Sequence, residues 1–182
     1  LDTKMVKVFQ LRLKNYKDTD LINTASLLNK ICIKKKVTFI LNDRVDIVKK
    51  LNLDGVHIGK DDGGIKRARG ILGNHKIIGS SCYNSNILSL KHQSLGVDYV
   101  AFGSFYRTKT KENTTNAVIS NFKKIKKNTK IPLVGIGGLN KFNIRRLRLL
   151  NLDFLAFCST IWKNKSSPKS EIISIKNVLD KF

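Results

Sequence analysis

Short, nearly continuous apolar or β-branched runs recur along the chain. They occupy seven segments, Val6–Leu11, Val37–Leu41, Asp54–Ile58, Lys76–Ser81, Asp98–Phe102, Ile131–Ile136 and Asp153–Phe157. Apolar runs of this length that do not alternate with polar residues are typical of strands buried on both faces, as in parallel sheets. The pattern therefore predicts seven buried strands.

Amphipathic segments separate these runs. In the first of them, Leu21, Ala25, Leu28 and Cys32 recur at steps of three and four, which places them on one face of a helix. Asn84 and Asn140 are candidate N-caps, because an Asn side chain accepts hydrogen bonds from the free backbone N–H groups of a first turn. The predicted helices are Thr19–Lys35, Arg44–Asn52, Gly63–Leu72, Asn84–Leu95, Thr115–Asn128, Asn140–Leu150 and Pro168–Lys181.

Strict alternation of strands and helices predicts an α/β fold with parallel strands, either an open doubly wound sheet or a closed (β/α)8 TIM barrel. The glycine cluster Gly135–Asn140 follows a strand, but Asn140 stands where a dinucleotide-binding fingerprint needs its third glycine. Polar and ionisable residues gather after the carboxyl ends of the strands, which is where barrels keep their active sites. The pattern thus favours the barrel.

Composition supports one domain. The 182 residues are 41% hydrophobic and carry 35 Lys and Arg against 13 Asp and Glu, a formal charge of +22. Length and apolar content suit a single domain over residues 1–182 with a real core. The lysine runs Lys34–Lys36 and Lys123–Lys127 lie on predicted helices, where charges normally form the solvated face. A solvated surface is favoured, and a basic nucleic-acid-binding module stays open as an alternative.

Neither a membrane span nor an export signal is visible in the sequence. The three cysteines, Cys32, Cys82 and Cys158, lie far apart and lack metal-ligand spacing, which indicates reduced thiols packed in the core. We therefore expect a soluble, cytoplasmic protein.

The polar residues after the strands suggest phosphate chemistry. Arg12, Lys14 and Lys111 supply cations, and Asp43 and Asp62 supply hard carboxylates. Mg²⁺ is commonly held by one or two carboxylates together with substrate phosphates, so this set suggests a magnesium-bridged diphosphate. Loops after the last two strands are the usual phosphate site of these barrels, and here they carry Gly138 and Ser159. The residues indicate an enzyme that handles a diphosphate with Mg²⁺ and a separate monophosphate.

Eight motifs, in order from about Val8 to Ile161, together resemble the thiamine-phosphate synthase family. They are Gln10–Lys14, Asn42–Arg44, Gly55–Asp62, Gly79–Ser81, Asp98–Gly103, Thr108–Lys111, Ile136–Gly138 and Ala156–Ser159. The resemblance implies a magnesium-dependent transferase of thiamine biosynthesis. Such an enzyme joins 4-amino-2-methyl-5-pyrimidinylmethyl diphosphate to a thiazole phosphate and releases pyrophosphate. In the family the diphosphate leaves first, and the thiazole nitrogen captures the resulting cation.

The resemblance also implies a role for each matching residue. Asp43 and Asp62 would bind Mg²⁺, and Ser81, Lys111 and Arg12 form the catalytic set. The diphosphate would be held by Arg12, Lys14, Asn42 and Lys111, and the pyrimidine by Gln10, His57 and Ser81. The thiazole phosphate would be held by Thr108, Thr110, Gly138 and Ser159, with Cys158 beside them. Purely structural roles stay open for three of these residues. His57 could be a structural histidine, Asp43 could cap a helix, and Cys158 could be a packing residue.

The sequence departs from the family pattern in several places. Lys60 stands where glutamine is common, and Ser104 and Arg107 stand where prolines are common. Family members also open with one more strand and helix before Gln10–Lys14, so the resemblance implies a barrel that lacks its first unit in this chain.

Two rivals share the predicted fold. A thiazole tautomerase relative needs no diphosphate leaving group, and it tends to lose the aspartates and the lysine that correspond to Asp43, Asp62 and Lys111. All three are present here, which favours the synthase. A degenerate synthase that binds phosphates without turnover is the second rival. Oligomeric state is not predicted.

Overall fold

The computed structural model describes residues 1–59, 64–107 and 122–181. Packing divides the chain into two compact units. Unit 1 comprises Leu1–Ser80 and Leu95–Asp98, and unit 2 comprises Ser81–Ser94 and Tyr99–Phe182. The single domain expected from the sequence stays a prediction.

Within the described residues, seven strands form one sheet in the order of the sequence, and each strand overlaps one of the predicted apolar runs. They are β1 Val8–Leu11, β2 Thr38–Asn42, β3 Gly55–Ile58, β4 Ile77–Tyr83, β5 Tyr99–Phe102, β6 Leu133–Ile136 and β7 Phe154–Ala156. The pairings β1–β2, β2–β3, β3–β4, β5–β6 and β6–β7 are parallel. The α/β class with parallel strands is confirmed, whereas these seven strands do not establish a complete eight-stranded barrel.

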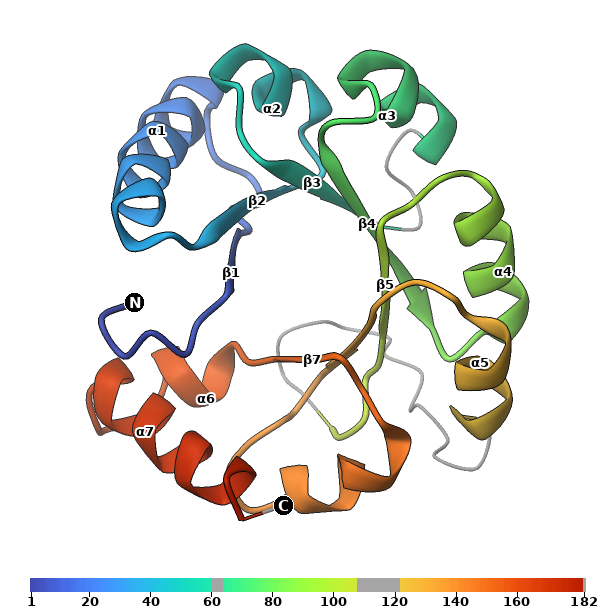
Figure 1. Cartoon of the computed structure of the whole chain (residues 1–182). Helices are drawn as coiled ribbons and strands as arrows, with labels where there is room; N and C mark the ends of the chain where they lie inside the picture. Colours follow the sequence, from blue (N-terminus) through green and yellow to red (C-terminus); the bar gives the residue numbers. More distant parts are fainter. Residues whose placement is uncertain (60–63, 108–121, 182) are drawn as a thin grey trace. The chain divides into compact units, whose positions relative to one another are not determined.

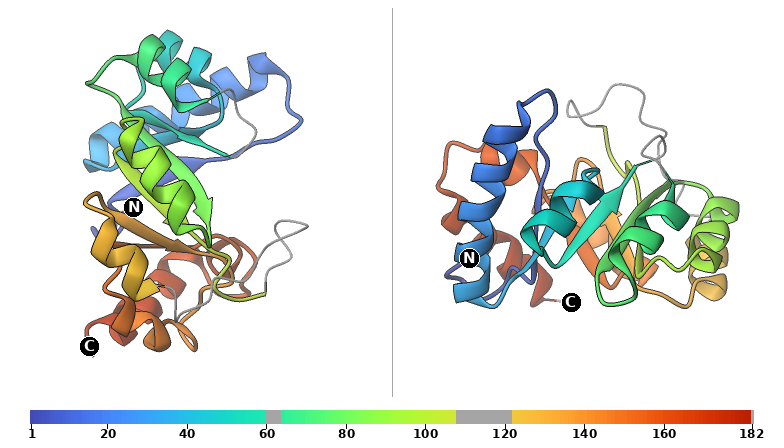
Figure 2. Two further views of the ribbon diagram at one scale, coloured as in Figure 1. Left: turned by 90° about the vertical axis from the view of Figure 1, so that its right-hand side faces the viewer. Right: turned by 90° about the horizontal axis from the view of Figure 1, so that it is seen from above.

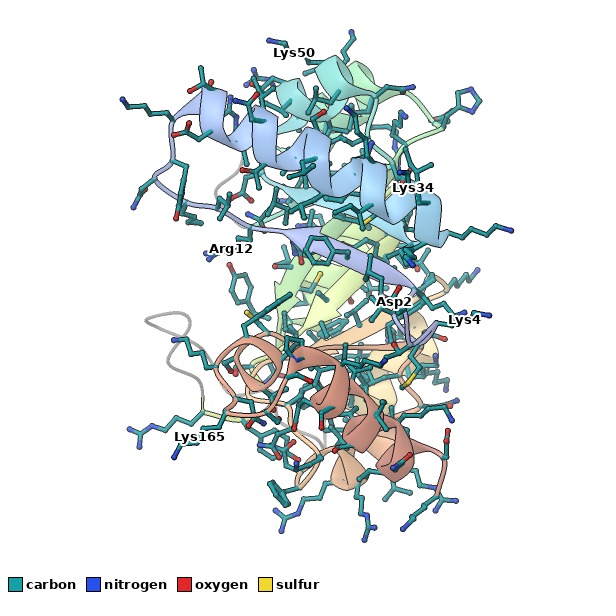
Figure 3. The ribbon with its side chains drawn as sticks, turned by 90° about the vertical axis from the view of Figure 1, so that its left-hand side faces the viewer. Asp2, Lys4, Arg12, Lys34, Lys50 and Lys165 are labelled. Carbon is teal, nitrogen blue, oxygen red and sulfur yellow. The ribbon has the colours of Figure 1, made fainter. Side chains whose placement is uncertain are left out.

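The helices of unit 1 cover one side of its strands. They are α1 Asp18–Lys35, α2 Val45–Leu51 and α3 Ile65–Leu72, and Figure 1 shows them in succession beside β1–β3. The predicted apolar face of α1 is confirmed, since Leu21, Ala25 and Cys32 are buried. The lysines at 34–36 are all exposed, and Lys50 of α2 points away from the strands in Figure 3. These cations belong to the solvated face.

Unit 2 contains α4 Asn86–Ser94, α5 Phe122–Asn128, η2 Ile144–Leu150, α6 Ser159–Trp162 and α7 Pro168–Leu179. Ser85, not Asn84, caps α4, because its Oγ accepts a hydrogen bond from Leu88 N at 3.1 Å. The short helix α6 is absent from the sequence-based assignment. It lies beside α7, as Figure 2 shows, and α7 is capped by Ser167 Oγ.

The segment predicted as an α-helix from Asn140 is instead a 3-10 helix, η2, over Ile144–Leu150. Its buried residues are Ile144, Leu147 and Leu150, at steps of three. A 3-10 helix has three residues per turn, so residues three apart lie on one face. The steps of three in the apolar pattern are the physical reason for the difference.

Three aspartates tie neighbouring strands together through their side chains. Each stands one residue before β3, β5 or β7, and its Oδ2 accepts a hydrogen bond from a backbone N–H of the preceding strand at 2.7 or 2.8 Å. The pairs are Phe39 with Asp54, Ile78 with Asp98, and Leu133 with Asp153. A hydrogen bond from the backbone of one strand to a carboxylate at the start of the next helps to fix the register of the two strands.

Arg69 of α3 holds the middle aspartate in place. Its Nη2 donates to Asp98 Oδ2 at 2.7 Å and to Gly96 O at 2.6 Å, and its Nη1 donates to Gly73 O and Lys76 O at 2.8 Å. One guanidinium thus joins the end of α3 to the starts of β4 and β5.

The cysteines behave differently from one another. Cys32 and Cys82 are buried, as expected, whereas Cys158 is exposed. The prediction that Cys158 packs in the core is therefore wrong. None of the three forms a disulfide in the part of the chain that the structure describes. Among the described residues, no helix combines the length and the apolar character needed to cross a membrane.

We predict that Asp98→Ala lowers the free energy of unfolding by about 1–3 kcal/mol, because the N–H of the fully buried Ile78 then loses its acceptor. Asp98→Asn keeps an acceptor oxygen and should cost less. Chemical denaturation of the two variants beside the unmodified chain measures this. Equal losses in both would contradict the assigned bond.

Candidate active site

The carboxyl ends of β1 and β2 place two of the candidate residues in contact. In the parallel register Leu11 lies opposite Leu41, and this brings Gln10 and Asn42 together at the strand ends. Gln10 Nε2 donates to Asn42 Oδ1 at 3.1 Å. Two amide side chains are therefore held side by side, with the Asn42 amide N–H groups available for a ligand.

Asp43 occupies a left-handed turn directly after β2. Its φ is +70°, a conformation that Asp and Asn tolerate better than most residues. Its backbone N–H donates to His57 O at 2.9 Å, and Val45 N donates to Asp43 O at 3.0 Å. The N-cap position of α2 is Arg44, so the alternative that Asp43 is the N-cap of this helix is wrong.

His57 lies on β3 opposite Asn42 and is only 8% exposed. All four residues of β3 are buried, and the His57 carbonyl holds the Asp43 turn. The structure thus shows a structural contribution of the His57 backbone, and a contact of its ring with a substrate stays a prediction.

The two cations of this cluster approach it from the segment after β1. Lys14 Nζ lies 4.0 Å from Asp43 Oδ2, with the lysine side chain 56% exposed and the aspartate 21%. Arg12 is exposed, and in Figure 3 it projects beyond the end of β1. A loosely paired, exposed ammonium can turn to an anionic ligand at little cost.

Arg44 is a residue of this region to which sequence reasoning gave no role. Its guanidinium donates hydrogen bonds to the carboxylates of Asp18 and Asp46. Hydrogen bonds from Arg44 lower the pKa of both aspartates, and the two carboxylates raise the pKa of the guanidinium. The available signal was an acidic residue at the start of each of two successive predicted helices, Asp18 just before Thr19–Lys35 and Asp46 within Arg44–Asn52.

In unit 2, two glycines after β6 form a tight turn. Gly137 has φ +101° and Gly138 has φ +66°, both in the region that favours glycine. A Cβ on Gly137 would lie 2.2 Å from Ser104 Oγ, and one on Gly138 would lie 2.8 Å from Tyr106 Cβ. Only glycine therefore fits at both positions, because a side chain at either would collide with the segment that holds Ser104 and Tyr106.

The side chains of Asn143 and Tyr106 hold this turn. Asn143 Nδ2 donates to Gly138 O at 2.8 Å, and Tyr106 Oη donates to Asn143 O at 2.9 Å. The N-cap of η2 is Asn143, so the predicted N-cap at Asn140 is wrong. Asn140 Oδ1 instead accepts from Phe142 N at 2.9 Å and Asn143 N at 3.2 Å, which closes the turn before η2. Sequence reasoning missed Asn143 and Tyr106: Asn143 follows the glycine motif closely, whereas nothing in the sequence connects Tyr106 with that motif.

The remaining described candidates lie at the ends of β4 and β7. Ser81 is half-buried on β4. Cys158 is the exposed N-cap of α6, and the half-buried Ser159 is the first residue of that helix.

Four candidates, Asp62, Thr108, Thr110 and Lys111, lie outside the described residues, as does Lys60. Of the other departures, Arg107 is exposed, whereas Ser104 is 4% exposed and packs where a Gly137 side chain would be. Within the described residues there is no group of three or more His, Cys, Asp or Glu that could hold a metal ion. Asp43 is the described carboxylate that could share a cation with substrate phosphates.

Comparison with known proteins identifies the family. The family model described as thiamine monophosphate synthase matches residues 1–161. A thiamine-phosphate synthase of Pelagibacter ubique is 43% identical over 173 residues, which cover 95% of this chain and 83% of the relative. One from Persephonella marina is 37% identical over 175 residues, covering 96% and 83%.

Solved structures agree with this result. The thiamine phosphate pyrophosphorylase of Pyrococcus furiosus superimposes with a TM-score of 0.86 at 27% identity, covering 96% of this chain and 83% of that one. A 3-hexulose-6-phosphate synthase matches with a TM-score of 0.69 at 13% identity, which is a likeness of fold alone. Because the family model spans most of the chain and the relatives exceed 30% identity, the chain belongs to the thiamine monophosphate synthase family.

Proposed function

We propose that the chain joins 4-amino-2-methyl-5-pyrimidinylmethyl diphosphate to 4-methyl-5-(2-phosphooxyethyl)thiazole, giving thiamine phosphate and pyrophosphate. The observation that carries the proposal is the cluster at the ends of β1 and β2 in unit 1. Its amides, ammonium and carboxylate come from the motif positions of the family whose model matches the chain. The cluster is cationic and exposed enough to receive a diphosphate.

Unit 1 would hold the leaving group. Arg12 can bind phosphate oxygens through two parallel N–H bonds, and Lys14 can turn its ammonium from Asp43 toward the diphosphate. Asn42 would donate its amide N–H, because its Oδ1 already accepts from Gln10. Lys111 would add a third cation. Gln10 and His57 would lie against the pyrimidine.

Asp43 and Asp62 would hold Mg²⁺ together with the substrate diphosphate, which fits the ion's preference for a few carboxylates and phosphate oxygens. When bound, Mg²⁺ neutralises negative charge on the departing pyrophosphate. The left-handed turn and the bond from Asp43 N to His57 O keep the Asp43 carboxylate at the strand end.

Unit 2 would hold the second substrate. The backbone N–H groups of the turn at Gly137 and Gly138 would bind its phosphate, and Ser159 would add its N–H and Oγ at the start of α6. Thr108, Thr110 and Cys158 complete the set that the family motif assigns to the thiazole phosphate. Ser81 would lie near the C–O bond that breaks.

The residues suit a dissociative reaction. Cleavage of the C–O bond leaves a pyrimidinylmethyl cation and pyrophosphate, and the thiazole nitrogen then forms the new C–N bond with its lone pair. No proton has to be removed from that nitrogen, so the step depends on positioning and on charge stabilisation of the leaving group. This agrees with a site made of cations and amides.

The proposal extends to the closed (β/α)8 barrel, which is supported by the TM-score of 0.86 with the Pyrococcus furiosus protein. A cytoplasmic location stays a prediction from the sequence.

We predict that the purified chain releases pyrophosphate only when both substrates and Mg²⁺ are present. A coupled phosphate assay after pyrophosphatase, with each component left out in turn, tests this requirement. Isomerisation of the thiazole without pyrophosphate release would favour the tautomerase. Binding of both substrates without product would favour a non-catalytic relative. Oligonucleotide binding with a steep salt dependence would favour the nucleic-acid module.

Asp43→Asn should lower kcat by about 100-fold or more, because it removes the carboxylate charge while Asn still tolerates the left-handed turn. Lys111→Ala should act in the same direction. Asp20→Asn, an exposed change in the first turn of α1, is the control and should leave kcat within about 2-fold. Steady-state kinetics measures these values, and an active Asp43→Asn enzyme would refute the assignment.

Gly138→Ala should raise the KM for the thiazole phosphate by about 10-fold or more, because the new Cβ meets Tyr106 and forces the turn to shift. The KM for the pyrimidine diphosphate should change little. Gly70→Ala in α3, where the new Cβ meets nothing within 4 Å, is the matched control. Equal changes in both KM values would argue against a phosphate site at Gly138.

A further inference from the structure

We propose that Arg44 is a positioning residue that holds the diphosphate-binding segments of unit 1 in register, an inference that rests on the proposed function. Arg44 follows Asp43 directly, and its guanidinium is engaged by two carboxylates of the chain itself. Its role is therefore to orient its neighbours.

The guanidinium makes four hydrogen bonds to two aspartates. Nη1 and Nη2 donate to Asp18 Oδ1 and Oδ2 at 2.5 and 2.8 Å. Nε and Nη2 donate to Asp46 Oδ1 and Oδ2 at 3.0 and 2.7 Å. Each carboxylate is thus bound through both of its oxygens, which is the arrangement that fixes geometry as well as charge.

The partners belong to different segments. Asp18 is the first residue of α1 and ends the segment that carries Arg12 and Lys14. Asp46 lies in the first turn of α2, which follows the Asp43 turn. Arg44 therefore ties the segment that bears the two cations to the turn that bears the carboxylate.

The backbone around Arg44 makes this tie rigid. Arg44 N donates to Asn42 O at 2.9 Å, and Arg44 O accepts from Val48 N at 3.1 Å. The Arg44 side chain is 32% exposed, whereas both aspartate side chains are 64% exposed. Arg44, the least exposed of the three side chains, is the one that contacts both aspartates, so it is the residue that connects the two segments.

Two other interpretations make different predictions. If Arg44 bound the diphosphate directly, removing Asp18 would free its guanidinium, and binding would be unchanged or tighter. If Arg44 only stabilised the fold, its loss would reduce the fraction of folded protein without changing the affinity of the molecules that remain folded.

The test uses inorganic pyrophosphate with Mg²⁺ in titration calorimetry, which requires no turnover. We expect Arg44→Gln and Asp18→Asn each to raise the Kd for pyrophosphate by about 10-fold, as for other residues that orient a binding group. Arg44→Lys keeps the charge but not the fork, and it should remain within about 3-fold of Arg44→Gln. Arg67→Gln, an exposed arginine of α3, is the control and should match the unmodified chain.

Kinetics and a double mutant supply a second readout. Arg44→Gln should raise the KM for the pyrimidine diphosphate and leave the KM for the thiazole phosphate unchanged, which a loss of folded protein cannot do. The Arg44→Gln and Asp18→Asn effects should be strongly non-additive, because each change breaks the same tie. Should Arg44→Gln fail to fold, Asp18→Asn carries the test, since it leaves the α2 N-cap intact.

Normal pyrophosphate affinity in Asp18→Asn or in Arg44→Lys would overturn the inference, as would additive effects in the double mutant. Pyrophosphate binding that follows the expected pattern in a chain without turnover would refute the proposed function and leave the role of Arg44 standing. Turnover with both substrates by a chain whose Arg44 and Asp18 variants bind normally would refute only the positioning role.

Discussion

The register of the parallel strands is the constraint on which the candidate site depends; backbone pairing sets it between β1 and β2, and aspartate carboxylates add to it further along the sheet. Asp54, Asp98 and Asp153 each bind a backbone N–H of the preceding strand. A slip of one residue would turn every side chain of a strand to the opposite face. In the β1–β2 pair, where backbone pairing sets Leu11 opposite Leu41, such a slip would separate Gln10 from Asn42.

The site residues are held in two ways, and the difference follows from their chemistry. Asp43 and Gly138 sit in left-handed turns whose backbones are fixed by bonds from Asp43 N to His57 O and from Asn143 to Gly138 O. Arg12 and Lys14 are exposed and reach the site from a segment without regular structure. Fixed backbone suits a carboxylate or a phosphate cradle, whereas long cationic side chains can adjust to a ligand.

The high positive charge divides between two surroundings. The lysines at 34–36 are exposed on or just after α1, and Lys35 pairs there with the exposed Asp2. Arg44 and Arg69 instead donate hydrogen bonds to carboxylates and backbone carbonyls within unit 1. Each of them thereby joins segments that are distant in the sequence. A guanidinium can do this because its planar donors address several acceptors at once. The +22 formal charge therefore says little about the partners of the protein.

The sequence by itself determined the seven strands, the parallel α/β class and the family. Continuous apolar runs have few other ways to be buried, and the motifs keep their order along the chain. The tertiary structure alone decided that Ile144–Leu150 is a 3-10 helix, that Cys158 is exposed, and that Asp43 turns left-handed without capping α2. It also decided the bonds of Arg44 to Asp18 and of the aspartates to neighbouring strands, since these join residues that no local pattern connects.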